Sequence, residues 1–225
     1  MTAVDCGARR IGNKPTMKIV HVAQYYNPGY GYQENILPLY QQAEGHEVVL
    51  LTSTRASSFV KARSFPAGES FDHGLRVRRL DIHCDFTDKF VCFRNLLEVL
   101  EQEKPDYIFH HMPTTLSIRE VCQYKRRHPD VFLAVDNHAD LTISIANTLL
   151  RTLYYNIFWK SFLKRYDRWI DLYFGVTPAR CLFLSEELGV PAEKVRLLPI
   201  GADTDNAVEL LDQAAFLKRF DLEAD

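Results

Sequence analysis

The sequence has 225 residues, of which 47% are hydrophobic and 25% are charged, and its formal net charge is −2. A chain of this length can bury a sizeable core, and one domain is the default expectation. The near-neutral charge gives no general attraction to nucleic acid, which disfavours a nucleic-acid binder. No apolar stretch approaches the roughly 18–20 residues that a membrane span needs.

The five cysteines are scattered, and no two of them form a CxxC pair. The sequence therefore indicates neither a disulfide framework nor a zinc site, and we expect a reducing, cytoplasmic environment. Residues 1–16 lack the apolar centre of a secretory signal. We interpret them as a flexible N-terminal extension, followed by an α/β domain at 17–205 and a helical tail at 206–225.

Strand-like and helix-like segments alternate after this extension, which favours a parallel sheet. The first predicted strand, 18–26, is a continuous apolar run, and the helix that follows it ends at Gly45. Pro38 has no N–H to donate to an upstream carbonyl, so this helix should begin near Glu34 or Asn35.

The remaining segments continue the alternation as far as residue 203. In chain order they are a strand at 48–53, a surface loop at 54–74, a strand at 75–82, a helix at 93–105, a strand at 106–112, a helix at 116–128, a strand at 131–136, a helix at 141–170, a strand at 172–178, a helix at 178–188 and a strand at 195–203. The pattern predicts a doubly wound, Rossmann-like fold, with a mainly parallel sheet and helices on both faces.

A glycine loop, QYYNPGYGYQEN at 24–35, follows the first strand. Gly29 and Gly31 stand where a ligand phosphate could approach the N-terminus of a helix. However, Glu34 occupies the third glycine position of the dinucleotide fingerprint, and the second strand ends without an acid for a ribose. A dehydrogenase or an epimerase that uses NAD is therefore a disfavoured alternative, and the absence of a GK[ST] step disfavours a P-loop.

Tyr30, Tyr32 and Gln33 give this loop flat faces and polar tips, which suit a sugar or another polyhydroxylated partner. The alternative is that the glycines serve only a tight turn. If Gly31 needs a positive φ or close backbone approach, a β-branched residue there should impair function.

Histidines follow two of the predicted strands. His138 lies just past the strand 131–136, at the carboxyl end where open α/β sheets place their ligands. A neutral imidazole there could bond a sugar hydroxyl, with Asp136 or Asp140 orienting it; the alternative is a loop histidine that bonds its own backbone.

His110 and His111 end the strand 106–112, so one should face each side of the sheet. One of them could line the cleft while the other packs inward. Their spacing to His138 matches no standard zinc pattern, and we expect no metal. His21, in the middle of the first strand, is interpreted as a satisfied core residue.

The stretch LLRTLYYNIFWKSFLKRYDRWI at 149–170 interleaves aromatic and basic residues. Such a face could lie on an anionic membrane surface. The alternative, which we favour, is a core helix whose charged groups face water while the lysine stems cover apolar surface.

Several stretches together resemble the N-terminal domain of the family 4 retaining glycosyltransferases, which have the GT-B fold. The matching segments, in order, are MKIVHVAQYYNPGYGYQE (17–34), GHEVVLLTS (45–53), PDYIFHHMP (105–113), VDNHAD (135–140) and FGVTPARCLFLSEELGVPAEKVRLLPIGADTD (174–205). The resemblance implies that the chain is one half of a GT-B fold.

It also implies an enzyme that transfers a sugar, with retained anomeric configuration, from a UDP- or GDP-sugar donor to a glycan or lipid-linked acceptor. The nucleotide would be bound by a C-terminal domain that these 225 residues do not contain, so we expect no cofactor on this domain alone and no catalysis by it alone. The role expected is bacterial surface polysaccharide synthesis in the cytoplasm or at the inner face of the cell membrane. The alternative from another class is a non-catalytic domain that binds a glycan or a partner.

Carried over to this sequence, the resemblance places His138 near the donor sugar and the loop of Gly29 and Gly31 near the donor diphosphate and the acceptor. Further residues at strand ends and loop starts are expected to line the cleft; they are His110, His111, Asp136, Asn137, Asp140 and Thr177.

Overall fold

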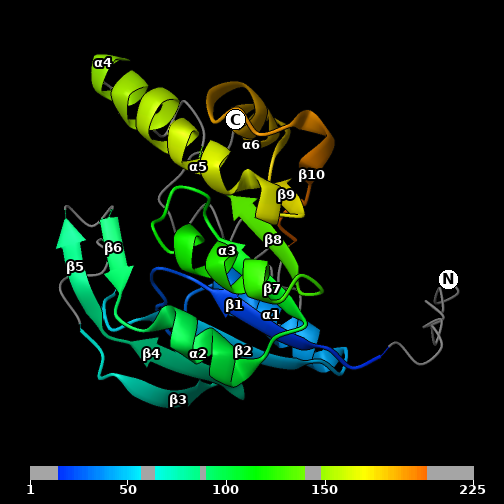
Figure 1. The fold of residues 1–225 in the computed structure, drawn as a ribbon. Helices are drawn as coiled ribbons and strands as arrows, with labels where there is room; N and C mark the ends of the chain where they lie inside the picture. Colours follow the sequence, from blue (N-terminus) through cyan, green and yellow to red (C-terminus); the bar gives the residue numbers. More distant parts are fainter. Residues whose placement is uncertain (1–14, 57–63, 87–89, 140–147, 202–225) are drawn as a thin grey trace, which may run out of the picture.

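The computed structural model describes residues 15–56, 64–86, 90–139 and 148–201. An eight-stranded sheet has the order β10-β9-β8-β7-β1-β2-β4-β3, and every neighbouring pair is parallel except β3 and β4 (Figure 1). Its strands are β1 (Lys18–Val22), β2 (Glu47–Ser53), β3 (Gly68–Asp72), β4 (Leu75–Leu80), β7 (Tyr107–His111), β8 (Phe132–Asn137), β9 (Leu172–Gly175) and β10 (Val195–Leu197). This is the doubly wound, Rossmann-like α/β fold that the sequence predicts.

Helices cover both faces of the sheet, with α1 on one face and α2 and α3 on the other (Figure 1). The longer ones are α1 (Gln33–Ala43), α2 (Leu96–Glu103), α3 (Ile118–Arg127), the π-helix η1 (Thr152–Trp159) and α5 (Lys160–Tyr166). The shorter ones are α4 (Thr148–Arg151), η2 (Asp167–Trp169), α6 (Pro178–Leu182), η3 (Phe183–Glu187) and η4 (Ala192–Lys194). The predicted helical tail lies outside the described residues.

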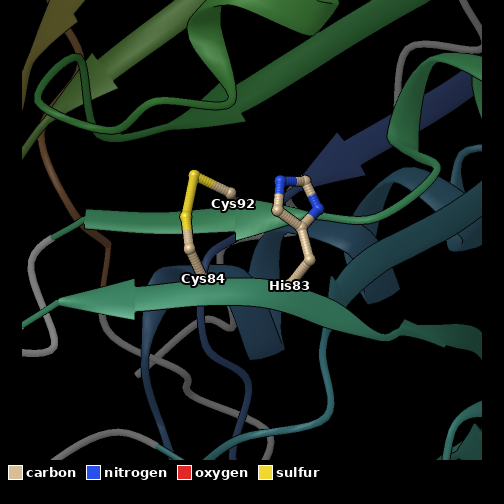
Figure 2. Close-up of side chains that lie close together, drawn as sticks. All are labelled: His83, Cys84 and Cys92. Atoms are coloured by element: carbon tan, nitrogen blue, oxygen red, sulfur yellow. A yellow bond between two sulfur atoms is a disulfide. The ribbon is translucent and has the colours of Figure 1, made fainter.

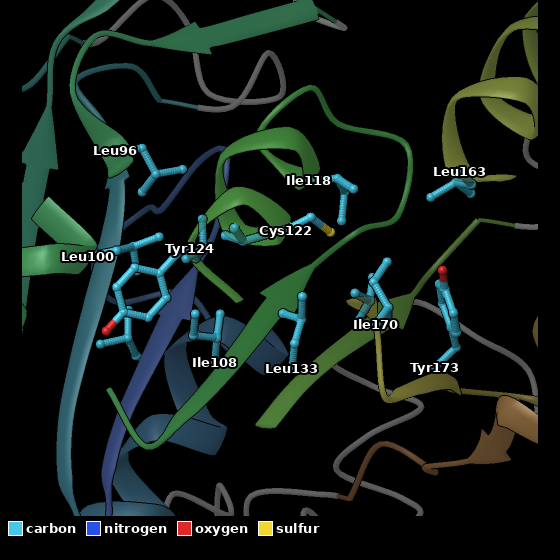
Figure 3. Close-up of a cluster of buried hydrophobic side chains, with 14 of the residues drawn as sticks. Leu96, Leu100, Ile108, Ile118, Cys122, Tyr124, Leu133, Leu163, Ile170 and Tyr173 are labelled. Atoms are coloured by element: carbon cyan, nitrogen blue, oxygen red, sulfur yellow. The ribbon is translucent and has the colours of Figure 1, made fainter. Parts of the chain in front are cut away.

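Alternating side chains on the strands supply two separate cores. On β1, Val20 and Val22 face the larger core with α2 and α3, whereas Ile19 faces the smaller one, against which Leu39 of α1 packs. Figure 3 shows the larger core, in which Ile108 and Leu133 of the sheet meet side chains of α2 and α3. Strands buried on both faces explain why the sequence shows continuous apolar runs rather than alternation.

The strand order reverses at β1. From β1 the chain moves outward through β2 to β4, and it then returns to place β7 on the other side of β1. Loops that leave the carboxyl ends of β1 and β7 therefore diverge to opposite faces of the sheet. In open α/β sheets, this reversal is where ligands bind.

The prediction of a loop at 54–74 is wrong in part, because Gly68–Asp72 forms β3, antiparallel to β4. Four of its five residues are exposed, so this edge strand has no apolar alternation that would reveal it. Helix α1 begins at Gln33, one residue before the predicted start, and keeps Pro38 inside it. It therefore lacks the bond from residue 38 to the Glu34 carbonyl.

A two-stranded hairpin of β5 (Ile82–Phe86) and β6 (Phe90–Phe93), which the sequence does not predict, stands apart from the main sheet. Cys84 and Cys92 lie opposite each other on these strands and form a disulfide (Figure 2). The expectation that no disulfide forms is therefore wrong for this pair. The two cysteines become neighbours only because the chain turns back between them.

The segment 149–170 continues from α4 through η1 and α5 to the end of η2. One row of side chains four residues apart, Tyr155, Trp159 and Leu163, is buried in the larger core, as expected of a core helix. Within the described residues, no helix has both the length and the apolar character to cross a membrane.

Gly175 ends β9 directly against α6. A Cβ atom at this position would lie 2.5 Å from both the backbone nitrogen and the Sγ of Cys181. We expect Gly175→Ala to lower the free energy of unfolding by about 1–3 kcal/mol, because overpacked sites must shift backbone. Chemical denaturation of the purified chain measures this change.

Gly31→Ala is the matched control. A Cβ atom at Gly31 meets nothing within 4 Å, and its φ lies outside the left-handed region. The free energy of unfolding should change by less than about 0.5 kcal/mol. Equal losses in the two variants would contradict the close packing assigned to Gly175.

Candidate functional site

A cavity of about 470 Å³ opens at the carboxyl ends of β1 and β7, where the strand order reverses. Five segments of the chain supply its walls: the loop after β1, the start of α1, the segment after β7, the turn after β8, and η1. The lining residues are Ala23, Gln24, Tyr25, Asn27, Tyr32, Glu34, His111, Met112, Thr114, Thr115, His138, Tyr154 and Tyr155.

The loop after β1 is anchored at Tyr26 and Asn27. The buried Arg79 donates to the carbonyls of Tyr26 and Ser53, both at 3.0 Å. Asn35 of α1 donates from Nδ2 to the carbonyl of Asn27 at 2.9 Å. Gly29 has a φ of 76°, a left-handed conformation that glycine adopts without strain.

The two sides of this loop face different pockets. Tyr32 and Glu34 line the cavity of about 470 Å³ where the strand order reverses, which we call the switch-point cavity. Gly31 and Gln33 line a neighbouring pocket of about 350 Å³. The rings of Tyr30 and Tyr32 stack at 5.7 Å and are exposed. Gly31 has neither a left-handed φ nor a close neighbour. Of the two glycines in this loop, it is therefore Gly29 that has the left-handed backbone that the sequence suggested for Gly31.

The buried carboxylate of Asp136, at the end of β8, organises the site. Its Oδ2 accepts from His111 Nδ1 at 3.0 Å and from His138 Nε2 at 3.2 Å. Its Oδ1 accepts from the backbone N–H of Met112 at 3.0 Å. Of the two acids that could orient His138, Asp136 bonds it; Asp140 lies outside the described residues.

Hydrogen bonds continue from His111 into the core. His111 Nε2 lies 3.0 Å from His21 Nδ1, and His21 Nε2 lies 2.6 Å from Gln41 Oε1. An amide oxygen only accepts, so His21 donates to Gln41. A neutral His21 then accepts at Nδ1 from His111. His111 thus donates from both nitrogens, which makes it an imidazolium paired with the Asp136 carboxylate.

The pKa values agree with this arrangement of protons. Burial lowers the pKa of His111, but the Asp136 charge outweighs burial and raises it. Burial raises the pKa of Asp136, and His111 and His138 together bring it far below its usual range. Burial and the positive charge of His111 lower the pKa of His21 to about 3, so His21 is neutral.

His110 and His111 face opposite sides of the sheet, as the strand pattern predicts. His111 lines the cavity, whereas His110 Nε2 bonds Ser117 Oγ at 2.9 Å inside the protein. His21 is a satisfied core residue, as expected, and it also extends the hydrogen-bonded chain.

Two residues that the sequence places in the cleft hold the backbone instead. Asn137 is buried and donates from Nδ2 to the carbonyls of Ala139 and Arg180 at 2.9 and 3.1 Å. Thr177 caps α6 by accepting from the N–H of Arg180 at 3.3 Å, the predicted N-cap. Neither residue lines the cavity.

Sequence reasoning missed several cavity residues. Thr114 and Thr115 follow β7, and Tyr154 and Tyr155 reach the cavity from η1. Met112 has a φ of 74°, a conformation rare for a residue with a side chain, which its bond to Asp136 holds in place. The position of Thr114 and Thr115 after a strand was the one available signal.

His111, Asp136 and His138 also have ligand types that a divalent cation accepts. One ligand atom from each lies within 4.8 Å of the others. In the structure these atoms bond one another, and Asp136 shares one oxygen between both histidines. The residues therefore satisfy each other without an ion.

The sequence matches the model of Glycosyltransferase Family 4 over residues 39–206. The chain belongs to glycosyltransferase family 4. The match covers His111, Asp136 and His138 but begins after the glycine loop.

Solved glycosyltransferases share the fold of this family 4 chain. The catalytic domain of starch synthase IV from Arabidopsis thaliana has a TM-score of 0.57 at 16% identity over 88% of this chain and 54% of its own. The lipopolysaccharide outer core galactosyltransferase WaaB has a TM-score of 0.50 at 10% identity over 84% of this chain and 47% of its own. The fold is therefore one half of GT-B.

The family 4 chain spans about half the length of these solved structures. A comparison with curated proteins finds no significant match.

Acid should destabilise the family 4 chain through its buried neutral histidines. His21 and His110 each have a pKa of about 3 when folded, against 6.5 for an ordinary histidine. Between these values the unfolded chain binds protons that the folded chain does not. The contribution of these two histidines to the free energy of unfolding is complete above pH 6.5. It is lost as the pH falls, by up to about 1.4 kcal/mol per pH unit for each group.

Urea unfolding at pH 4.5 and 6.0 tests this prediction, with a smaller loss expected in His21→Gln. In this window His111 is charged in both the folded and the unfolded chain, so it adds little. His73→Gln, at a highly exposed position, should behave like the parent chain. Equal pH dependence in His21→Gln and the parent would overturn the neutral state assigned to His21.

Proposed function

We propose that this chain is the acceptor-side half of a retaining glycosyltransferase, which moves a sugar from a UDP- or GDP-sugar to a glycan or lipid-linked acceptor. The observation that supports this most directly is His138, held by Asp136 at the edge of the switch-point cavity. Membership of family 4 supports glycosyl transfer in general. The donor nucleotide would be held by a second domain, and this domain would need no cofactor of its own.

His138 would act on the donor sugar. Its Nε2 donates to Asp136, which leaves Nδ1 as the ring atom that can accept from a sugar hydroxyl. The Asp136 carboxylate behind the ring holds it in this orientation and places a negative charge near the cavity edge. Such a pair stabilises the oxocarbenium-like centre that develops when the glycosidic bond to the nucleotide breaks.

The loop after β1 would receive the acceptor and approach the donor diphosphate. The exposed, stacked rings of Tyr30 and Tyr32 offer flat apolar faces with hydroxyl tips, which suit sugar rings. Glu34 places a carboxyl group in the cavity wall at the first turn of α1. That charge disfavours a pyrophosphate resting on this helix N-terminus, as in dinucleotide-binding folds.

The segment from α4 to α5 has side chains that suit contact with a membrane surface. Leu149, Leu153 and Ile157 are 69%, 48% and 55% exposed and, at a spacing of four residues, form one row. Basic side chains follow along the same segment, and the exposed ones are Lys164, Arg165 and Arg168. Exposed leucines on a segment that also carries basic groups fit the anionic inner face of a bacterial cell membrane, where a lipid-linked acceptor for a surface polysaccharide would be presented.

His138→Ala should lower kcat/KM for sugar transfer by about 100-fold or more, because it removes an electrostatic contact to the developing charge. The assay follows sugar transfer in the longest protein that the gene encodes, and circular dichroism checks the fold. His128→Ala replaces a histidine that pairs with Glu101 and does not line the cavity, so it is the control. Unchanged transfer in His138→Ala would refute the role proposed.

Binding to anionic vesicles tests the membrane surface. Leu149→Ser/Leu153→Ser should reduce co-sedimentation with phosphatidylglycerol vesicles about tenfold, because each leucine that leaves the interface loses its burial. Leu182→Ser alters a residue of α6 that is 54% exposed and serves as the control. Equal sedimentation of all three proteins would argue against membrane contact.

The exposed tyrosine pair also favours a second candidate, a domain that binds a glycan without transferring it. Glycan binding that depends on Tyr32, in a complete gene product that transfers no sugar from any nucleotide-sugar donor, would favour this candidate. Transfer that depends on His138 would exclude it.

A further inference from the structure

A second cluster of side chains lies on the β5–β6 hairpin, away from the switch-point cavity. His83, Cys84 and Cys92 each offer one ligand atom, and these atoms lie within 4.8 Å of one another. Figure 2 shows all three side chains on the same side of the hairpin. Imidazole and thiolate are the groups that bind soft and borderline metal ions such as Zn²⁺ most readily.

The irregular pairing of the hairpin explains this grouping. Cys84 and Cys92 are directly opposite in an antiparallel pair, so both point to one side. His83 precedes Cys84 and would normally point to the other side. The register shifts between Ile82 and Cys84, and such a bulge re-aims a side chain.

In the structure the two sulfurs are joined in a disulfide, which cannot bind a metal as two thiolates. In a reducing compartment such a disulfide persists poorly. The same two side chains then become a pair of thiols whose backbones are held 5.2 Å apart at Cα by the hairpin.

We propose that, once this disulfide is reduced, His83, Cys84 and Cys92 bind one Zn²⁺ ion, so that the hairpin is cross-linked by sulfur when oxidised and by metal when reduced. An external dithiol reductant supplies two electrons and two protons. The bond between Cys84 and Cys92 breaks and an S–H group forms on each cysteine, while the external dithiol is oxidised to a disulfide. Binding of Zn²⁺ then releases the two thiol protons to solvent.

The surroundings can supply a further ligand. His83 and Cys92 line a cavity of about 520 Å³ together with Glu98 and Glu120. Glu120 interacts electrostatically with His83, and a carboxylate or a water can complete a tetrahedral zinc site. Arg94 and Arg119 line the same cavity and limit its net negative charge.

The cross-link has a structural consequence at the other site. Phe90, at the start of β6, stacks on Trp159 of η1 at 5.7 Å and contacts Tyr154 edge-on at 6.0 Å. Tyr154 lines the switch-point cavity. A hairpin held by either cross-link therefore supports η1 where η1 forms a cavity wall.

Metal titration of the full chain tests the proposal, with Zn²⁺ and with Co²⁺ as the spectroscopic probe. The dithiothreitol-reduced chain, freed of reductant under anaerobic conditions, should bind one Co²⁺ with a thiolate-to-cobalt charge-transfer band and the visible bands of tetrahedral Co²⁺. Zn²⁺ should displace it. The oxidised chain should show no such band.

Variants assign the ligands. Cys84→Ser and His83→Asn should each weaken Zn²⁺ binding by more than the roughly 10–100-fold that loss of an outer-shell partner costs. Cys181→Ser is the thiol control, and His138→Ala removes the other cluster of metal-binding groups. Both controls should keep the charge-transfer band.

Three results would overturn the proposal. They are a reduced chain that binds no Co²⁺, a Co²⁺ complex without the thiolate band, and equal Zn²⁺ affinity in His83→Asn and the parent. Melting curves check that each variant is folded before titration.

Discussion

The buried carboxylate of Asp136 is the constraint on which the site depends. It has no exposed surface, and it accepts from His111, His138 and the Met112 amide. A buried charge that loses such partners costs several kcal/mol, so each donor is held where it is. This explains the left-handed backbone at Met112 and the orientation of His138 toward the cavity edge.

The network around Asp136 connects the core to the cavity. His111 is charged because it lies between an anion and a neutral histidine that can only accept from it. The positive charge is therefore buried next to the cavity, beside the carboxylate that bonds His138. A ligand in the cavity meets a fixed electrostatic environment that needs no rearrangement when it binds.

A second buried charge lies at the amino ends of the strands, and its partners are different. Glu103 of α2 is 5% exposed and pairs with Lys18 at 3.0 Å, Arg78 at 3.3 Å and Arg76. These three cations come from β1 and β4, so the cluster ties α2 to the amino ends of the strands. The buried charge at the amino ends of the strands therefore stabilises the fold, whereas the buried charge at the carboxyl ends borders a cavity.

Several features of the fold could be predicted from the sequence, because patterns among neighbouring residues indicate them. Continuous apolar runs marked the buried strands, Thr177 and Pro178 marked a helix start, and alternation placed His110 and His111 on opposite sides of the sheet. Strand β3 lacked such a pattern, because its exposed residues need not be apolar. Strand β6 does bury Val91 and Phe93, but its four residues are too few to give a clear period.

The sequence by itself determined the fold class, the family resemblance and the importance of the strand ends, since all three depend on residue order along the chain. Only the tertiary structure decided that His21, His111, Asp136 and His138 form one hydrogen-bonded chain, and that Cys84 meets Cys92. It also decided that Asn137 supports the backbone, through its bond to the Arg180 carbonyl, rather than lining the cavity. The reason is physical: apart from the local bond between Asp136 and His138, these contacts join residues on different strands and helices. Only the sheet order and the packing of the helices set the distances between such residues.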